Sequence, residues 1–331
     1  MKKIIASIAF FGCMFCYAQN GYKVVKTYHI PSTGGWDYIA VNNGKIYVSH
    51  GTQVNILDES KGDSIGIIPN TNGVHGIAFN NEMGRGYTSN GRANNVTVFD
   101  LNNNQAITQI ATGENPDAIM YEPYTKKIIT CNGRSRNLSV IDPLTNTVIA
   151  TIDVGGKPET AVSDGNGKIF VNIEDKNEIV AVDLKSHSVT DHRSLNGAEG
   201  PTGLAYDEET KRLFAGCDDW LVVVNAENGK VVDKLAIGQG CDGVAFDPKN
   251  KMIFTANGAT GTITAIQEMG PDKYSVIGNY PTKRGARTIT FDEKSGNLLL
   301  PTADFDMNNI QPNGRPAMIP GTFQVLVVQK Q

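Results

Sequence analysis

The feature that most constrains the fold of this chain is a pattern that returns about every forty residues. Short apolar or alternating runs recur in a fixed order, and turn-forming residues separate them. Such runs predict strands, and no stretch keeps a helical period. Aligning the copies on the residue before each first strand gives seven equivalent positions: Asp37, His75, Asp117, Glu159, Thr202, Asp242 and Arg287.

These positions are 38 to 45 residues apart, which is the size of a four-stranded propeller blade. Seven copies predict an all-β, seven-bladed β-propeller with four antiparallel strands in each blade. The seventh copy contains only three strands, near 288–291, 298–300 and 323–328. We expect the N-terminal segment 23–30 to supply the fourth, because an incomplete blade would expose an unpaired edge.

The start of the chain has the pattern of a signal peptide. Lys2 and Lys3 precede an apolar run over 4–15, and Ala18 precedes Gln19 as a small residue at the cleavage position. That run is shorter than the ~20 residues of a membrane-spanning helix, and no other stretch is apolar enough. We therefore expect removal of residues 1–18, and one propeller domain over 19–331 in the periplasm or outside the cell. The alternative is a lipoprotein signal that ends at Cys13.

Charge and cysteine content limit the partners and the crosslinks. The formal net charge is −4, and loss of the two leader lysines makes the chain more acidic. An acidic surface disfavours a nucleic-acid backbone as partner. We expect a monomer that binds an unidentified small ligand or protein. Three cysteines remain after cleavage, and Cys217 and Cys241 fall at neighbouring positions that could form a disulfide. Cys131 is then expected to be a buried thiol.

Three segments carry a family resemblance: 45–49 (Lys-Ile-Tyr-Val-Ser), 138–152 and 168–172 (Lys-Ile-Phe-Val-Asn). They resemble the YVTN-repeat (YncE-like) β-propeller proteins of bacteria, and the resemblance covers essentially the whole mature chain. It implies the propeller fold. It implies no particular activity, because the family has no agreed one, and it assigns no functional residue.

The seven aligned residues should surround one mouth of the central channel, because the first strand of each propeller blade lines that channel. We expect a ligand there to contact Asp37, His50, His75, Asp117, Glu159, Asp242 and Arg287. The alternative is that these polar residues are only hydrated. A second tier is expected at the ends of the second strands, from His50, Asn90, Asn132, Ile173, Cys217, Asn257 and Thr302.

Within this group, two histidines and two carboxylates are candidates for a divalent metal site. His50 and His75 are expected to face each other across adjacent blades, with Asp37 and Asp117 alongside. Imidazole and carboxylate together suit zinc or another transition ion better than calcium. No motif for any other cofactor is present.

The segment 303–322 has no strand pattern and interrupts the seventh copy. Long loops often act as lids or binding loops, so we expect this one to cover the channel mouth through Met307, Ile310 and Arg315. The alternative is a decorative insertion. Arg134 and Arg136, with Arg92 nearby, lie in loops of the same face and could meet an anion.

No catalytic signature stands out in the sequence. The match to G-x-S-x-G at 62–66 falls in an outer hairpin, where it lacks the strand-to-helix context of hydrolases. The sequence therefore favours a binding or interaction protein outside the cytoplasm. The alternative is a metal-dependent hydrolase or lyase with its site in the channel and His75 as a base.

Overall fold

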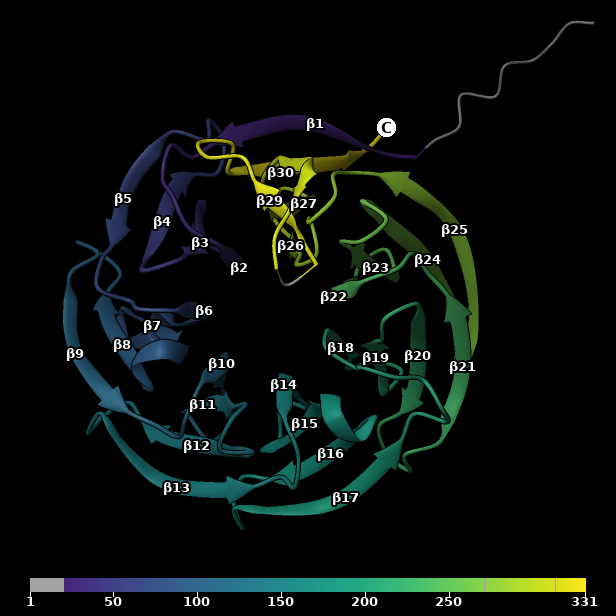
Figure 1. Ribbon diagram of the computed structural model, residues 1–331. Coiled ribbons are helices and arrows are strands. Elements are labelled where there is room, and N and C mark those ends of the chain that lie inside the picture. Colours follow the sequence, from purple (N-terminus) through teal and green to yellow (C-terminus); the bar gives the residue numbers. More distant parts are fainter. Residues whose placement is uncertain (1–20, 271, 313) are drawn as a thin grey trace, which may run out of the picture.

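The computed structural model describes residues 21–270, 272–312 and 314–331, and it is a seven-bladed β-propeller (Figure 1). The signal peptide expected over residues 1–18 lies outside the described residues. Each blade is a four-stranded antiparallel sheet, and the blades surround a central axis. This confirms the predicted fold class and the number of blades.

The first four blades are built from consecutive strands, which follow one another from the channel outward. Blade 1 consists of β2 (Trp36–Asn42), β3 (Lys45–His50), β4 (Gln53–Asp58) and β5 (Ser64–Ile68). Blade 2 consists of β6 (Val74–Asn80), β7 (Arg85–Asn90), β8 (Asn95–Asp100) and β9 (Ala106–Ala111). Blade 3 consists of β10 (Pro116–Glu122), β11 (Lys127–Asn132), β12 (Asn137–Asp142) and β13 (Thr147–Asp153). Blade 4 consists of β14 (Pro158–Ser163), β15 (Lys168–Ile173), β16 (Glu178–Asp183) and β17 (Ser188–Ser194).

The remaining blades follow the same order, except that the last one draws on both ends of the chain. Blade 5 consists of β18 (Leu204–Asp207), β19 (Arg212–Gly216), β20 (Trp220–Asn225) and β21 (Val231–Ala236). Blade 6 consists of β22 (Cys241–Asp247), β23 (Met252–Asn257), β24 (Thr262–Gly270) and β25 (Lys273–Pro281). Blade 7 consists of β26 (Thr290–Asp292), β27 (Asn297–Thr302), β30 (Gln324–Lys330) and β1 (Tyr22–His29).

The burial of each strand follows from its place in the blade. The second and third strands, such as β11 and β12, are buried along almost their whole length because neighbouring blades cover both of their faces. They therefore read as nearly continuous apolar runs. The outermost strands, such as β13, alternate between exposed and partly buried residues, the pattern of a strand with one wet face.

Blade 7 closes the ring as the sequence predicts. β1 pairs antiparallel with β30 along its whole length and forms the outer edge of that blade (Figure 1). Tyr28 is buried, and its hydroxyl donates to the carbonyl of Glu59 in the next blade at 2.8 Å. The N-terminal strand thus joins blade 7 to blade 1 and leaves no incomplete sheet.

The 303–322 segment is more ordered than predicted. It forms a hairpin of β28 (Phe305–Ile310) and β29 (Pro316–Met318), which pair antiparallel as a separate two-stranded sheet. Asparagines and prolines hide the strand pattern here, and the pairing register shifts between Asp306 and Ile310. The prediction of a structureless loop was therefore wrong.

The helical content is small. Three short 3-10 helices occur in the described part of the chain, η1 (Asn81–Met83), η2 (Gly91–Ala93) and η3 (Glu174–Lys176). Among the residues described, no helix has the length and apolar character needed to cross a membrane.

Candidate functional site

A repeated β-bulge places most of the aligned residues at one end of the channel. In blades 1, 2, 3, 4 and 6 the pairing register between the first and second strands shifts at the aligned residue. Bulges leave a residue unpaired and redirect its side chain. In blade 1 the Ser49 hydroxyl spans the bulge, because it accepts from the Asp37 amide and donates to the Tyr38 carbonyl, each at 3.1 Å.

We call the seven aligned residues the mouth ring: Asp37, His75, Asp117, Glu159, Thr202, Asp242 and Arg287. Five of them form a chain of charges that runs through five consecutive blades. Arg287 donates to Asp242 at 2.7 Å and to Asp37 at 3.1 Å. The Nδ1 atom of His75 lies 2.6 Å from Asp37 Oδ2 and 3.9 Å from Asp117 Oδ1. With His75 protonated, the signs alternate from Asp242 to Asp117.

The remaining two members of the mouth ring differ from this chain. Glu159 is buried and is paired with Lys157 at 2.7 Å, and Lys157 also contacts Glu174. Thr202 donates its hydroxyl to the carbonyl of Cys241 at 2.9 Å, so it ties blade 5 to blade 6. The structure therefore brings the seven aligned residues together at the channel mouth, and Thr202 has a structural contact there.

Burial and mutual repulsion make the ring favour bound protons. Burial opposes the charge of His75, but the hydrogen bond to Asp37 and the negative charge of Asp117 outweigh it and raise the pKa of His75 to about 8. Burial, followed by the charge of Asp37, raises the pKa of Asp117 to about 7. Burial, followed by the charge of Asp117, raises the pKa of Glu159 to about 8. Clustered perturbed groups are typical of functional sites.

Tyr38 completes this site, and the sequence reasoning missed it. The position after each mouth-ring residue is small in every other blade, with Gly76, Ala118, Thr160, Gly203, Gly243 and Thr288. Small side chains let neighbouring first strands approach, since a Cβ on Gly243 would lie 3.0 Å from the Thr288 Cα. Among the seven positions that follow the mouth-ring residues, Tyr38 is the one large side chain. That contrast in size could have identified Tyr38 from the sequence.

The surroundings of Tyr38 place it among the acidic members of the ring. It packs against core residues of blades 3 and 4 although it comes from blade 1. Burial, followed by the charges of Asp117, Glu159, Asp37 and Asp242, raises the pKa of Tyr38 well above its ordinary value. The hydroxyl therefore stays protonated at neutral pH and can donate a hydrogen bond in the channel.

Two recesses open on the face of the mouth ring, and they share Trp36 and Arg287. The first has a volume of about 730 Å³ and contains His75, Arg92 and Arg134 among its lining residues. We call it the His75 recess. The second has a volume of about 680 Å³ and reaches from Asp242 to the β28–β29 hairpin. We call it the hairpin recess.

The hairpin contributes to the second recess, but not through all the predicted residues. Phe305, Arg315 and Pro316 line the hairpin recess, and the Phe305 ring lies 6.0 Å from that of Trp36. Met307 and Ile310 are exposed and line neither recess. Of the three predicted loop contacts, the structure places Arg315 at the site.

His50 does not belong to the channel mouth, contrary to the prediction. It is buried, and its ring stacks on Phe323 at 3.9 Å. Its Nδ1 lies 2.6 Å from the Ser32 hydroxyl, and its Nε2 lies 2.9 Å from the Gly34 carbonyl oxygen. Both ring nitrogens are therefore engaged, and burial lowers the pKa of His50. The predicted pairing of His50 with His75 at one metal ion does not fit this arrangement.

The other residues of the expected second tier are also inside the protein. We call the set the strand-end tier: His50, Asn90, Asn132, Ile173, Cys217, Asn257 and Thr302, all fully buried or nearly so. Asn132 is representative, since its amide donates to Asn137 and Ser139, each at 2.9 Å. Asn90 and Asn257 hold neighbouring strands together in the same way, and no member of the tier lines either recess.

The predicted disulfide is absent from the structure. Cys131, Cys217 and Cys241 are all free and buried. The Cys217 thiol points toward the carbonyl of Ala215, and the Cys241 thiol points toward that of Gly243. Burial raises the pKa of the Cys217 thiol to about 12, so it is an unreactive thiol.

A smaller metal-binding group remains without His50. One ligand atom from each of Asp37, His75 and Asp117 lies within 4.8 Å of the others. One nitrogen and two carboxylate oxygens suit a transition ion. An ion there would have to replace the His75–Asp37 hydrogen bond and share Asp37 with Arg287.

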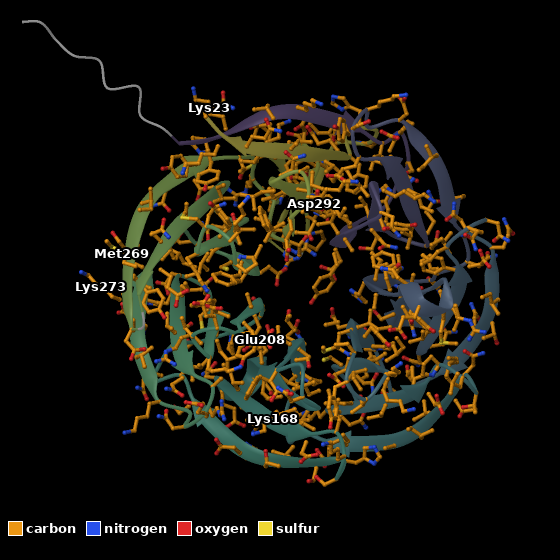
Figure 2. The ribbon with its side chains drawn as sticks, turned by 180° about the vertical axis from the view of Figure 1, so that it is seen from behind. Lys23, Lys168, Glu208, Met269, Lys273 and Asp292 are labelled. Carbon is orange, nitrogen blue, oxygen red and sulfur yellow. The ribbon has the colours of Figure 1, made fainter. Side chains whose placement is uncertain are left out.

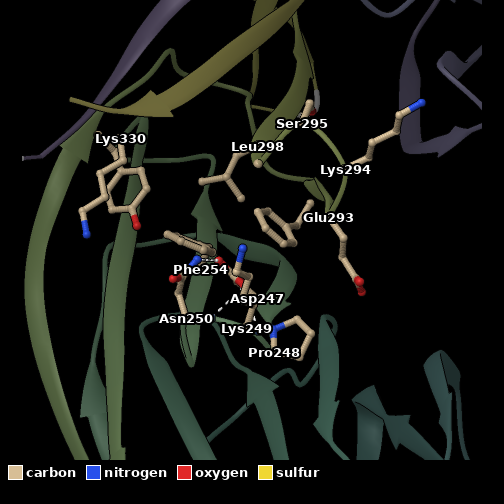
Figure 3. A pocket seen from close by; sticks show the side chains of 13 residues that line it. Asp247, Pro248, Lys249, Asn250, Phe254, Glu293, Lys294, Ser295, Leu298 and Lys330 are labelled. Carbon is tan, nitrogen blue, oxygen red and sulfur yellow. Dashed lines mark hydrogen bonds between the residues drawn. The ribbon is translucent and has the colours of Figure 1, made fainter.

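The opposite face of the propeller has recesses of a different kind. Figure 2 shows that face, with Glu208 and Asp292 toward the centre of the ring. A pocket of about 330 Å³ between blades 6 and 7 is lined by Asp247, Phe254 and Leu298, among others (Figure 3). It includes no member of the mouth ring.

Comparison with solved structures supports the architecture. The chain is similar to a chain of the hydrazine synthase of Kuenenia stuttgartiensis, with a TM-score of 0.72 and 15% identity over 82% of this chain and 94% of that one. It is also similar to the WD40 repeats of RRP9, with a TM-score of 0.75 and 10% identity over 94% and 98% of the two chains. No protein-family model and no curated protein sequence matches this chain. At these identities the structural likeness shows that the chain has the seven-bladed propeller fold.

Proposed function

We propose that this chain is an exported propeller of the YVTN-repeat (YncE-like) type that holds a small ligand or a protein partner at the channel mouth. One observation carries the proposal. The mouth ring gathers desolvated charges from six blades beside two recesses of several hundred cubic ångströms. Buried charges cost folding free energy unless they are well paired, so such a concentration favours a binding role.

Three further features support this proposal. Propellers commonly serve as interaction scaffolds, because loops of several blades meet on one rigid face. The YVTN-repeat assignment is supported by segments 45–49, 138–152 and 168–172.

Export is supported by the basic and apolar pattern of the first eighteen residues. Mass spectrometry of the protein recovered from a bacterial periplasm should give a chain that begins at Gln19.

Tryptophan fluorescence tests ligand binding at the mouth. The chain has two tryptophans, and Trp36 lines both recesses whereas Trp220 lies under the Lys234 ammonium at 4.5 Å. In the Trp220→Phe variant, Trp36 is the only reporter. We expect at least one compound from a panel of anionic, neutral and cationic small molecules and peptides to shift its emission.

The matched control is Trp36→Phe, in which the same compound should leave the emission of Trp220 unchanged. If no compound or peptide shifts the emission of Trp36, a binding role for this face is wrong.

The Asp37–His75–Asp117 group favours a second candidate, a metal-dependent hydrolase or lyase with its site in the channel. Elemental analysis of the purified protein separates the two functions. The enzyme requires about one transition ion per chain, lost in the His75→Ala variant. A binding protein of the kind proposed contains no stoichiometric ion, because Arg287 already neutralises Asp37.

A further inference from the structure

We infer that the His75 recess binds a small molecule through an oxyanion group, either a carboxylate or a phosphate. This inference rests on the proposed function and adds a ligand class to it. It depends on the charges that line the recess, on the positions of the donor atoms and on the shape of the walls.

The His75 recess is strongly cationic in an acidic protein. It is lined by Arg92, Arg134, Arg287 and His75, and among the described residues that line it Asp37 is the only carboxylate. The whole chain has a net charge of −4. Positive side chains gathered in one concave site raise the local concentration of anions.

Two of these cations have no acidic partner. Among the described residues, no carboxylate lies within ion-pair distance of Arg92 or Arg134. Neighbouring cations of the same face are paired, since Arg136 contacts Asp175 at 3.2 Å and Lys157 contacts Glu159. Arg92 and Arg134 thus bring two guanidinium charges to the recess that no carboxylate in the described part of the chain neutralises.

His75 presents a third donor to the recess. Its Nδ1 is taken up by Asp37, which leaves Nε2 on the opposite side of the ring. A Cβ on Gly91 would lie 2.6 Å from this Nε2 and 2.8 Å from the Asn115 Oδ1, so Nε2 faces the loop between β7 and β8. That loop carries Arg92. Among the described residues, none forms a hydrogen bond with His75 Nε2.

The backbone around Arg92 is tightly fitted. Gly73 has φ of +68°, and a Cβ there would lie 2.8 Å from the Arg92 amide nitrogen and 2.9 Å from its Cβ. Glycine is therefore required at this position for Arg92 to approach the rim. The start of the Arg92 side chain has a fixed position beside the recess.

This set of donors matches an oxyanion better than any other ligand. Guanidinium groups bind carboxylate and phosphate through paired N–H donors, and such charge-assisted bonds are among the strongest in proteins. The indole of Trp36 offers an apolar wall for the rest of the molecule, and a volume of about 730 Å³ suits a metabolite-sized ligand.

Isothermal titration calorimetry of the full chain tests the inference at pH 6.5 and low ionic strength. The probes are inorganic phosphate, succinate and, as a cationic comparison, choline. We expect phosphate or succinate to bind with a Kd below about 1 mM and choline to give no heat. Loss of one charge-assisted contact weakens binding about tenfold or more, so Arg92→Gln and Arg134→Gln should each raise the Kd by at least that factor.

Arg136→Gln is the matched control, because Arg136 is exposed in the same loop as Arg134 but does not line the recess. The Kd of this variant for the oxyanion should stay within about twofold of that of the unmodified chain. This change is much smaller than the roughly tenfold weakening expected when one charge-assisted contact is lost. A response to phosphate alone or to succinate alone identifies which oxyanion is recognised. Two results overturn the inference: no heat with either oxyanion, or an unchanged Kd in both recess variants. If a cationic or neutral compound still shifts the emission of Trp36, the proposed binding role survives and only the ligand class is wrong.

Discussion

The mouth ring and the strand-end tier both recur once in each blade, yet the structure uses them in opposite ways. Every side chain of the tier is at most 1% exposed. In the mouth ring the side chains of Asp37, Asp117, His75 and Arg287 are 15%, 14%, 26% and 35% exposed. A polar residue that repeats around a propeller is therefore a site candidate only when its strand leaves it open to the channel.

The difference comes from the environment of the strand. The second strand of each blade lies between neighbouring blades, so a polar residue at its end must find protein partners. Asn90, Asn132 and Asn257 do so in the same way, each accepting from a threonine two residues earlier and donating to the next strand. The first strand has one face on the channel, and its bulge turns the aligned residue toward water.

The largest expected contrast is between the two histidines. His50→Ala should lower the free energy of unfolding by about 3 kcal/mol, because it removes a buried ring that stacks on Phe323 and bonds Ser32 and Gly34. His75→Ala should lower it by about 1 kcal/mol or less, since it also relieves desolvation at the mouth. Urea unfolding measures both. Equal losses would remove the distinction between tier and ring.

A second contrast compares two polar residues of blade 3. Asn132→Ala should lower the free energy of unfolding by about 2 kcal/mol, because Asn137 and Ser139 both lose the hydrogen bond that the buried Asn132 amide donates to them. Asp117→Asn should be neutral, or stabilising by up to about 1 kcal/mol at pH 8, because it removes a partly buried carboxylate that repels Asp37. A large loss in Asp117→Asn would show that this carboxylate stabilises the fold.

The pH dependence of stability should come from the ring. His75 faces Asp37 from β2, Asp117 from β10 and, farther away, Glu159 from β14, while Asp242 and Arg287 extend the charge chain. The folded state raises the pKa of His75 and of Glu159, each to about 8, so it holds these protons more tightly than the unfolded chain. For His75 the stabilisation is complete below pH 6.5 and is lost as the pH rises through about 8.

The raised pKa of Glu159 has an effect of the same sign. Its stabilising proton is lost as the pH rises above the usual carboxyl range, so folding becomes less favourable. The shift of His75 alone corresponds to a loss of about 2 kcal/mol between pH 5.5 and 8.5, and Glu159 adds to it. His75→Gln and Glu159→Gln should each flatten the curve of stability against pH. A stability that rises over this range would contradict these assignments.

The smallest expected difference concerns two cysteines, one in the strand-end tier and one next to the mouth ring. Cys217 belongs to the tier, and Cys241 precedes the ring residue Asp242. Because both thiols are free, denatured protein should give equal thiol titres with and without prior reduction. A titre that rises by two thiols after reduction would show a disulfide bond between Cys217 and Cys241.

The blade count, the closure of the ring and the mouth ring could be predicted from the sequence. The spacing of the repeat predicts seven blades, and the missing strand of the last copy predicts closure by the N-terminal segment. Alignment on the first strands predicts the mouth ring, because equivalent positions in a rotational repeat face the same axis.

Other features depend on contacts between blades that spacing does not contain. His50 looks like His75 in the sequence, but packing against Phe323 of blade 7 buries it. Tyr38 was predictable only from the small residues that occupy the equivalent position in the other blades. The β28–β29 hairpin was hidden because asparagine and proline are poor strand signals.

A pH titration of the histidine ring signals by NMR tests the separation of ring and tier most directly. The chain has five histidines, and the His50→Gln and His75→Gln variants assign the two that matter. We predict that His75 titrates near pH 8 and shifts when phosphate or succinate is added, while His50, whose pKa burial lowers, titrates below the ordinary histidine range and does not respond. A His50 that titrates normally and responds to the added anion, beside a silent His75, would contradict the account.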